Sequence, residues 1–151
     1  MSDFLCLWAE GFSEGLDVLD DEGRSRLLAC CARKCADTGV AERHRRLYAE
    51  AGSRDEYYRR LHELGGVRGE ILSPGAEYLV VFPDCACDLH TCLDVNTPRL
   101  CECSRQSLLY VTQQAAGTSA FTVDCLGTVL TGEKDCRFRI AYQNASDRPD
   151  E

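Results

Sequence analysis

The apolar residues near the N-terminus follow the period of an amphipathic helix. Between residues 3 and 19 they are Leu5, Trp8, Phe12, Leu16 and Leu19. Successive members of this set are three or four residues apart, so a helix places all of them on one face. The pattern predicts a first helix that buries this face against the rest of the protein.

Three further helices are predicted before residue 66. We expect them over residues 21–36, 41–51 and 54–64. Asp20 is a suitable N-cap for the second helix, and Ser53 and Glu56 have the capping-box spacing that opens the fourth. The N-terminal part of the chain is therefore predicted to be helical.

After residue 65 the pattern changes to short apolar runs that are typical of strands. The runs VRGEILS and EYLVVF, within residues 67–82, are separated by Pro74-Gly75, which suits a type II turn. A second hairpin is predicted from SAFTVDCLGTVL and CRFRIAYQ, within residues 119–143. Apolar and charged residues alternate in its last strand, so one face of that strand is expected to be buried.

Between the hairpins, Ser104 is a suitable N-cap for a helix from about residue 105 to 116. The predicted fold class is α+β, with a helical N-terminal half packed on a small antiparallel sheet of two hairpins that have a helix between them. We expect one domain and a mobile acidic tail. The boundaries are residues 1–143 for the domain, about 1–65 for its helical part, about 66–143 for its sheet and cysteine-loop part, and 144–151 for the tail.

Charge and hydropathy argue against two classes of partner. The chain has 17 Lys and Arg against 25 Asp and Glu, a net charge of −8. A surface this acidic repels phosphate backbones, so we expect no nucleic-acid partner. No apolar run approaches the roughly 20 residues that cross a bilayer, and the acidic start differs from a signal peptide. We therefore expect no membrane partner and a cytoplasmic location, and the oligomeric state stays open.

Cysteine is unusually frequent, with 11 in 151 residues. Two Cys-x-Cys pairs, Cys85 with Cys87 and Cys101 with Cys103, lie in the loop between the second strand and the next helix. Persistent disulfides are rare in a reducing compartment, so clustered thiols favour metal binding or redox chemistry. In an extended segment residues two apart point to the same side, so each pair can offer both sulfurs to one ion.

Four thiolates suffice for a closed tetrahedral zinc site, and an iron–sulfur cluster takes the same number. We predict zinc, with an iron–sulfur cluster as the alternative, on the ligands Cys85, Cys87, Cys101 and Cys103. Further candidate ligands are Cys31, Cys35, His90 and Cys92. The first two, one helical turn apart, are equally explained as core residues beside Leu27. We expect Arg99 and Arg105 to offset the negative charge of the thiolates.

Catalysis by a cysteine is the main alternative to metal binding. Cys103 directly precedes a predicted helix, whose N-terminal amides lower the pKa of a thiol and so favour a nucleophile. No acid–base partner is visible, because His44 and His62 are expected to be solvated. Cys125 and Cys136 are expected to lie in the core. Reduced thiols without a special role are the third interpretation.

Four motifs resemble those of an uncharacterised cysteine-rich bacterial family whose members are labelled by similarity to L-2-amino-thiazoline-4-carboxylic acid hydrolase. They are CARKCA on the second helix, CAC and CECS in the loop, and VLTGEKDCRFRI near the end. The resemblance marks Cys31, Cys35, Cys85, Cys87, Cys101, Cys103 and Cys136. It implies that the second helix packs beside the loop and shares the site.

A more distant similarity is to the 4-vinyl reductase domain, on a helix flanked by hairpins with a late Cys-x-Phe strand. That superfamily binds small apolar molecules and often zinc. The function predicted is a small metal-binding domain that binds or senses a small molecule, a metal or the redox state. The alternatives are a thiolate-dependent hydrolase of a cyclic thiazoline-type substrate and an iron–sulfur protein.

Overall fold

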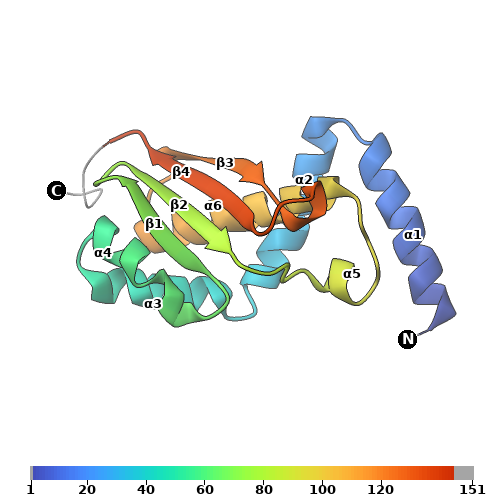
Figure 1. Cartoon of the computed structure of the whole chain (residues 1–151), viewed down its shortest axis with the longest axis horizontal. Coiled ribbons are helices and arrows are strands. Elements are labelled where there is room, and N and C mark those ends of the chain that lie inside the picture. The colour runs from blue at the N-terminus through green and yellow to red at the C-terminus, as the bar shows by residue number, and fades with distance from the viewer. Residues whose placement is uncertain (1, 145–151) are drawn as a thin grey trace.

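The structure is a computed structural model that describes residues 2–144. Within this range the chain forms six α-helices and a four-stranded antiparallel sheet, which is the α+β class that the sequence predicts (Figure 1). Except for Asn144, the tail predicted at residues 144–151 lies outside the described residues. None of the helices between residues 2 and 144 has the length and hydropathy needed to span a bilayer.

The helices and strands follow in the predicted order. The helices are α1 (Asp3–Val18), α2 (Asp21–Ala36), α3 (Val40–Ala51), α4 (Arg54–Arg59), α5 (Asp88–Thr91) and α6 (Glu102–Ala116). The strands are β1 (Arg68–Ser73), β2 (Glu77–Phe82), β3 (Phe121–Gly127) and β4 (Cys136–Tyr142). Short 3-10 turns are η1 (Leu61–Leu64), η2 (Pro98–Cys101) and η3 (Val129–Thr131). The hydrophobic pattern does not predict α5 or η2, which both lie in the cysteine loop.

Side-chain caps start the second and fourth helices at the predicted places. Oδ1 of Asp20 accepts a hydrogen bond from the N–H of Gly23 at 2.8 Å, and Oγ of Ser53 accepts one from the N–H of Glu56 at 3.2 Å. Each bond satisfies an amide that the first helical turn leaves unpaired, and this fixes where the helix begins. Both predicted caps are confirmed.

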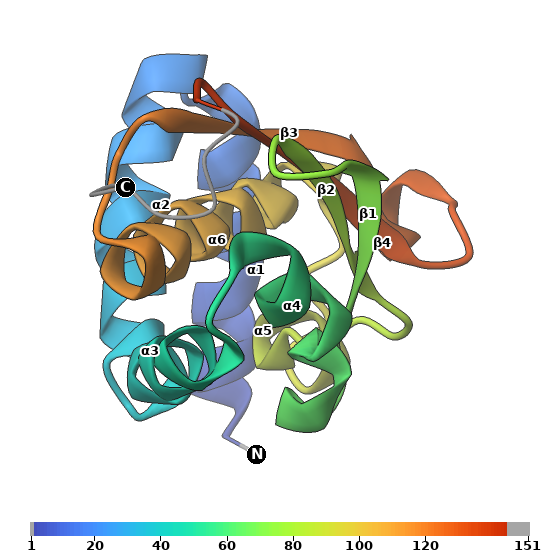
Figure 2. The same cartoon turned by 90° about the vertical axis from the view of Figure 1, so that its left-hand side faces the viewer.

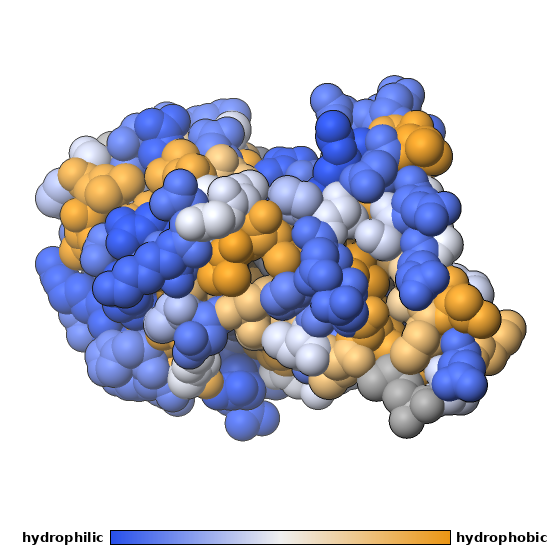
Figure 3. Space-filling model, turned by 45° about the vertical axis from the view of Figure 1, so that its right-hand side comes forward, coloured by the Kyte–Doolittle hydropathy of each residue, from blue (hydrophilic) through white to orange (hydrophobic). Residues whose placement is uncertain are grey.

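The buried face of α1 differs from the predicted one. Leu16 is fully buried, but Leu5 is 40% exposed and Trp8 is 56% exposed. The face that packs contains Ala9 and Leu16, which share a small core cluster with Leu100 of η2. The helix stands at one end of the molecule (Figure 1), and Figure 3 shows hydrophobic residues at the surface there. The prediction holds for Leu16 and Phe12, which pack in this cluster, and fails for Leu5 and Trp8, because periodicity identifies an apolar face but not how much of it has a partner.

The sheet joins the two predicted hairpins side by side. Its strand order is β1-β2-β4-β3, and each neighbouring pair is antiparallel. In the turn between β1 and β2, the N–H of Ala76 donates to the carbonyl of Ser73 at 3.0 Å, and Gly75 has a φ of 73°. Glycine adopts this φ without steric cost, so the geometry fits the type II turn predicted at Pro74-Gly75.

The main core lies between the sheet and helices α3, α4 and α6, which cover one of its faces (Figure 2). Phe138 and Ile140 of β4 are fully buried there, in the same cluster as Val111 of α6. Burial of side chains of this size stabilises a fold by roughly 1.5–3 kcal/mol each. This layer of contacts therefore holds α6 against the sheet and fixes the position of its start, where Cys101 is the N-cap and Cys103 lies in the first turn.

Helix α6 begins earlier than predicted, at Glu102 rather than at about residue 105. The chain enters it through η2, where Oγ1 of Thr97 accepts a hydrogen bond from the N–H of Arg99 at 3.3 Å. Pro98 suits the first turn because it has no N–H to leave unpaired. Thr97 and Pro98 therefore start the helical segment, and the predicted cap at Ser104 is wrong.

The two cysteines expected in the core of the second hairpin have different environments. Cys136 is buried, as predicted, but Cys125 is exposed. Cys125 pairs with Phe138, and the register of β3 against β4 shifts between Cys125 and Gly127. This irregularity ends the regular alternation of β3 and explains why the prediction for Cys125 is wrong.

Candidate functional site

A cavity of about 350 Å³ lies between α2, the first turn of α6, the loop after β2 and the start of β4. We call it the cysteine-lined cavity, because six cysteines line it: Cys35, Cys85, Cys87, Cys101, Cys103 and Cys136. These are six of the seven cysteines that the family resemblance marks. Cys6, Cys30, Cys92 and Cys125, which the resemblance leaves out, do not line it.

The sheet and α6 bring these cysteines together from distant parts of the sequence. Strand β2 ends at Phe82, opposite Cys136 at the start of β4, and the chain then runs directly into Cys85 and Cys87. Helix α6 packs against α2, which places its first turn beside Cys35. The loop, two helices and one strand therefore share one cavity, and the predicted packing of the second helix beside the loop is confirmed.

The thiols divide into two groups within and around the cavity. On the side of the sheet, the thiol of Cys101 interacts electrostatically with those of Cys136, Cys125 and Cys85. The thiol of Cys136 also interacts with that of Cys85. We call this set the sheet-side thiols: Cys85, Cys101, Cys125 and Cys136. On the side of α2, the thiol of Cys103 interacts most with those of Cys87, Cys31 and Cys35, and less with that of Cys101, so the two sides adjoin. We call this set the α2-side thiols: Cys31, Cys35, Cys87 and Cys103.

Each Cys-x-Cys pair thus contributes one sulfur to each group. Cys101 ends η2 and Cys103 lies in the first turn of α6, so the two residues follow helical rather than extended geometry. Residues two apart on a helix are separated by about 200° around its axis. The expectation that this pair points both sulfurs in one direction is therefore wrong, because the helix begins earlier than predicted.

Burial keeps the thiols of Cys101 and Cys103 protonated. Burial, with neighbouring thiols as a further cause, raises the pKa of Cys103 to about 12 and that of Cys101 to about 11. The expectation that a helix N-terminus lowers the pKa of Cys103 is wrong, since desolvation of the thiolate outweighs the helix dipole here. Without a thiolate at neutral pH, Cys103 is a poor nucleophile.

Several sulfurs nevertheless have polar partners that hold their side chains in place. Sγ–H of Cys101 donates to Oγ1 of Thr128 at 3.2 Å, and Sγ of Cys136 accepts from the N–H of Val129 at 3.4 Å. Burial raises the pKa of the Cys87 thiol, and hydrogen bonds from the backbone N–H groups of Leu89 and His90 oppose this effect only in part. Backbone N–H groups directed at sulfur favour the thiolate, which is the form that binds metals.

The donor types fit a soft metal ion, but the sulfurs are not gathered as a formed site. All 11 cysteines are free thiols. Over residues 2–144, no three side chains of His, Cys, Asp or Glu meet in a way that could hold a metal ion. Zinc on Cys85, Cys87, Cys101 and Cys103 therefore stays a prediction.

The other candidate ligands lie in mixed environments. Cys31 and Cys35 are exposed on α2, so they are not core residues beside Leu27. Cys92 is also exposed and lies outside the cavity. His90, on α5, has its Nδ1 buried without a hydrogen-bond partner.

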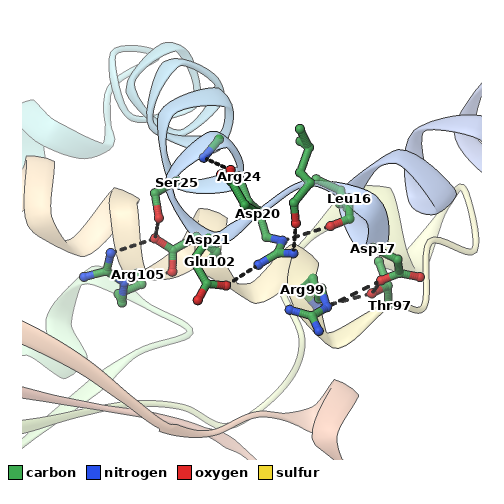
Figure 4. Close-up of polar contacts among 12 residues, drawn as sticks. Leu16, Asp17, Asp20, Asp21, Arg24, Ser25, Thr97, Arg99, Glu102 and Arg105 are labelled. Atoms are coloured by element: carbon green, nitrogen blue, oxygen red, sulfur yellow. Dashed lines mark hydrogen bonds and ion pairs between the residues drawn. The ribbon is translucent and has the colours of Figure 1, made fainter.

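A second and more polar hollow, of about 850 Å³, lies beside the corner between α1 and α2. Its charged groups largely satisfy one another (Figure 4). Arg24 donates through Nε to the carbonyl of Leu16 at 2.9 Å and through a terminal nitrogen to Asp21 at 2.9 Å. Oγ of Ser25 donates to Glu102 at 2.8 Å, which ties α2 to α6. These contacts hold the helices together and leave few unpaired groups for a ligand.

Two arginines near the loop pair with carboxylates instead of with thiols (Figure 4). Arg105 lies 2.7 Å from Glu102, and Nε of Arg99 lies 3.9 Å from Oδ1 of Asp17. The expectation that both arginines offset the charge of a thiolate site is therefore wrong for Arg99. Arg105 still interacts favourably with the thiolate form of Cys125, although burial raises the pKa of that thiol.

A buried hydroxyl network was not expected from the sequence. Nδ1 of His44 lies 2.7 Å from the hydroxyl of Tyr57, and the hydroxyls of Tyr58 and Tyr142 are 2.9 Å apart. His44 is buried, and burial lowers its pKa to about 4. The prediction that His44 is solvated is therefore wrong. His62 is exposed, as predicted. Tyrosines at helical spacing could have indicated which helix faces are buried. The sequence gives no sign that His44 of α3 contacts Tyr57, because Tyr57 belongs to another helix, α4.

Comparison with known proteins shows a likeness in fold. No protein-family model and no curated protein matches the chain. Among solved structures, the chain is similar to the phenol-responsive sensory domain of the transcription activator PoxR with phenol, at a TM-score of 0.54 and 17% sequence identity. The match covers 91% of this chain and 74% of that chain. The shared fold is in line with the more distant resemblance stated above, and the resemblance to the family labelled as a thiazoline hydrolase stays a prediction.

Proposed function

We propose that this protein is a sensory domain that binds a small, largely apolar molecule in the cysteine-lined cavity. The observation that carries the proposal is this cavity, set in a fold shared with a phenol-responsive sensory domain. Ligand cavities commonly measure about 300–1,000 Å³, and about 150 Å³ already holds a benzene ring. A cavity of about 350 Å³ is therefore suited to a molecule with one ring and a small substituent.

The residues that line the cavity favour a neutral ligand. Phe82, Leu100 and Leu130 supply apolar surface, and thiols are only weak hydrogen-bonding groups. Ser104 and Ser107 supply hydroxyls for one polar substituent. Among residues 2–144, no lysine, arginine or histidine lines the cavity, whereas Asp84 does, so an anion would lose hydration there without gaining a cation.

We also propose that thiols of the loop bind zinc, with ligands drawn from Cys85, Cys87, Cys101 and Cys103. The support is chemical, because thiolates select zinc and other soft metals. An iron–sulfur cluster uses the same donors, and its visible absorption would distinguish it from colourless zinc. Metal analysis of protein purified without oxygen tests the proposal, and less than about half an equivalent of metal per chain would contradict it.

The hydrolase alternative has lost its main physical argument. The raised pKa of Cys103 leaves little thiolate at neutral pH. None of His44, His62 and His90 lines the cavity, so no histidine is placed there to take up the proton of the thiol. Ring opening by cysteine is therefore not part of the function that we propose.

Thermal unfolding with one-ring probes tests the small-molecule proposal. We expect phenol and similar neutral molecules to raise the Tm, and benzoate to leave it unchanged. A ligand at 100 times its Kd stabilises the folded state by about 2.7 kcal/mol. Ser107→Leu should abolish the shift because the larger side chain fills part of the cavity, whereas Gln113→Leu, exposed on the same helix, should preserve it. The proposal fails if no neutral probe shifts the Tm, or if Ser107→Leu responds like the wild type.

A further inference from the structure

Two cysteines on α2 form a pair that core packing does not explain. Cys31 and Cys35 are four residues apart, so their side chains lie one turn apart on the same flank of the helix. The buried stripe of α2 consists of Leu28, Ala32 and Ala36, and both cysteines are exposed beside it. Helices use this spacing to present two ligands to one metal ion, as in His-x₃-His zinc sites.

Two more cysteines approach this pair from other elements. Cys103 lies in the first turn of α6, which packs against α2, and Cys87 precedes α5 as its N-cap. Both line the cavity together with Cys35. The thiol of Cys103 interacts electrostatically most with those of Cys87, Cys31 and Cys35, and less with that of Cys101. The thiol of Cys87 interacts with that of Cys85 and, next, with that of Cys35. Three of these four cysteines line the cavity, and the fourth, Cys31, lies one helical turn from Cys35.

We propose that the α2-side thiols are the ligands of one soft divalent metal ion, such as zinc or cadmium: Cys31, Cys35, Cys87 and Cys103. This inference rests on the metal binding proposed above and changes its ligand set. Each Cys-x-Cys pair supplies one sulfur to the ion, while Cys85 and Cys101 remain as thiols on the sheet side. The helical geometry at Cys101 and Cys103 is the reason, since it directs the two sulfurs apart.

A cation is the ligand that suits this arrangement. Neighbouring thiols disfavour one another's ionisation, and a divalent ion reverses that effect, because each thiol that binds releases its proton to solvent. The sulfurs have to move closer together to bind. Each cysteine has a single side-chain rotor, and Cys31 and Cys35 are exposed, where rotation meets little resistance.

Such a site would also connect the parts of the chain that line the cavity. The ion would link α2 to the first turn of α6 and to the loop before α5. These three segments surround the cavity, so the ion would fix their spacing and hence the space open to a small molecule. The metal ion would therefore lie beside the ligand cavity and outside the sheet-side thiols.

Metal titration of cysteine variants tests the assignment. The full chain, purified with reductant and without oxygen, is titrated with zinc or cadmium against a chromophoric chelator, and the ultraviolet absorption of cadmium–thiolate bonds reports the sulfur ligands. The variants are Cys31→Ser/Cys35→Ser, Cys85→Ser/Cys101→Ser and the control Cys6→Ser/Cys30→Ser. The control pair is exposed and outside both thiol groups. Circular dichroism of the metal-free proteins verifies that each variant folds.

Loss of one residue that hydrogen-bonds to a metal ligand lowers metal affinity about 10–100-fold. Cys31→Ser/Cys35→Ser removes two direct ligands, so we expect its affinity to fall more than about 100-fold. Its cadmium–thiolate absorption should fall by about half, and the other two variants should keep wild-type affinity within about threefold. If Cys85→Ser/Cys101→Ser loses the metal and Cys31→Ser/Cys35→Ser retains it, the assignment is overturned while zinc binding by the loop stands. If the wild type binds neither ion, both metal proposals are overturned, and small-molecule binding is decided separately by the thermal shifts.

Discussion

The thiols of Cys101 and Cys103 lie where a helix begins, yet burial rather than the helix decides their ionisation. The pKa of both is raised, to about 11 and about 12, first by burial and then by neighbouring thiols, although for Cys101 the contact with Thr128 acts in the opposite direction. A helix N-terminus favours a charge by about 0.3–1 kcal/mol at an exposed site, whereas each pKa unit corresponds to about 1.4 kcal/mol. Desolvation is therefore the larger effect in this cavity.

This difference predicts which cysteines react. At pH 7 a thiol with a pKa of about 11 or more is ionised in roughly one molecule in ten thousand or fewer, and the thiolate is the reactive form. We expect iodoacetamide to label the exposed Cys6, Cys30 and Cys92 well before Cys101 and Cys103. Mass spectrometry of digested samples at increasing times checks the order. Rapid labelling of Cys103 would contradict it and restore the catalytic interpretation.

His44 makes the stability of the protein depend on pH. Burial, with a smaller contribution from Arg43, lowers its pKa from 6.5 to about 4. The unfolded chain then binds a proton at higher pH than the folded one, so this contribution to stability is complete above about pH 6.5 and is lost as the pH falls towards 4. We expect the free energy of unfolding to fall by up to about 1.4 kcal/mol per pH unit in this range.

Urea unfolding between pH 7 and 5 measures this slope, above the range in which the carboxyl groups take up protons. The control is His44→Phe, which keeps the ring volume but has no group to titrate. The slope should disappear in this variant even if its absolute stability falls with the loss of the hydrogen bond to Tyr57. An equal slope in both proteins would show that another group is responsible.

At the scale of single helices and strands, local patterns predict where elements lie but not what covers them. The spacing of apolar residues and the caps at Asp20 and Ser53 are local, and the helices that they predict are present. The exposure of Trp8 and the early start of α6 depend on contacts that are distant in sequence or on a competing cap at Thr97. Sequence spacing contains no information on which of two suitable caps the tertiary structure selects.

Two glycines provide a matched test of element packing. A side chain on Gly69 of β1 would overlap the backbone carbonyl of Tyr58, where α4 approaches the sheet. Because the backbone at Tyr58 can move only at a cost in free energy, we expect Gly69→Ala to destabilise the fold by about 1–3 kcal/mol. Gly15, inside α1, has open space around it, so Gly15→Ala should stabilise by about 1 kcal/mol. Urea unfolding of both variants checks these opposite signs, and two effects of the same sign would contradict the packing described here.

At the scale of the whole molecule, the sequence predicts that the clustered cysteines share a site, and six of them line one cavity. Their division into two groups is not predictable from spacing, because it depends on the direction in which α6 leaves η2 and on the packing of α2 against it. The arginines pair with carboxylates for the same reason, since Glu102 reaches Arg105 only because it lies within the first turn of α6. Long-range packing, rather than the order of residues in the sequence, therefore determines which of the two groups each thiol belongs to.

The proposed metal site and the proposed ligand cavity share Cys35, Cys87 and Cys103, so binding at one should affect the other. Coupling between two sites is reciprocal, with typical factors of about 5–150. We expect zinc to change the Kd of a neutral one-ring probe by such a factor, and the probe to change the Kd of zinc equally. Calorimetric titration of each ligand with and without the other measures both factors. Cys31→Ser/Cys35→Ser should remove the coupling while leaving probe binding itself in place, because Cys31 lies outside the cavity lining and serine at Cys35 preserves its volume. Coupling that persists in this variant would place the metal on the sheet side instead.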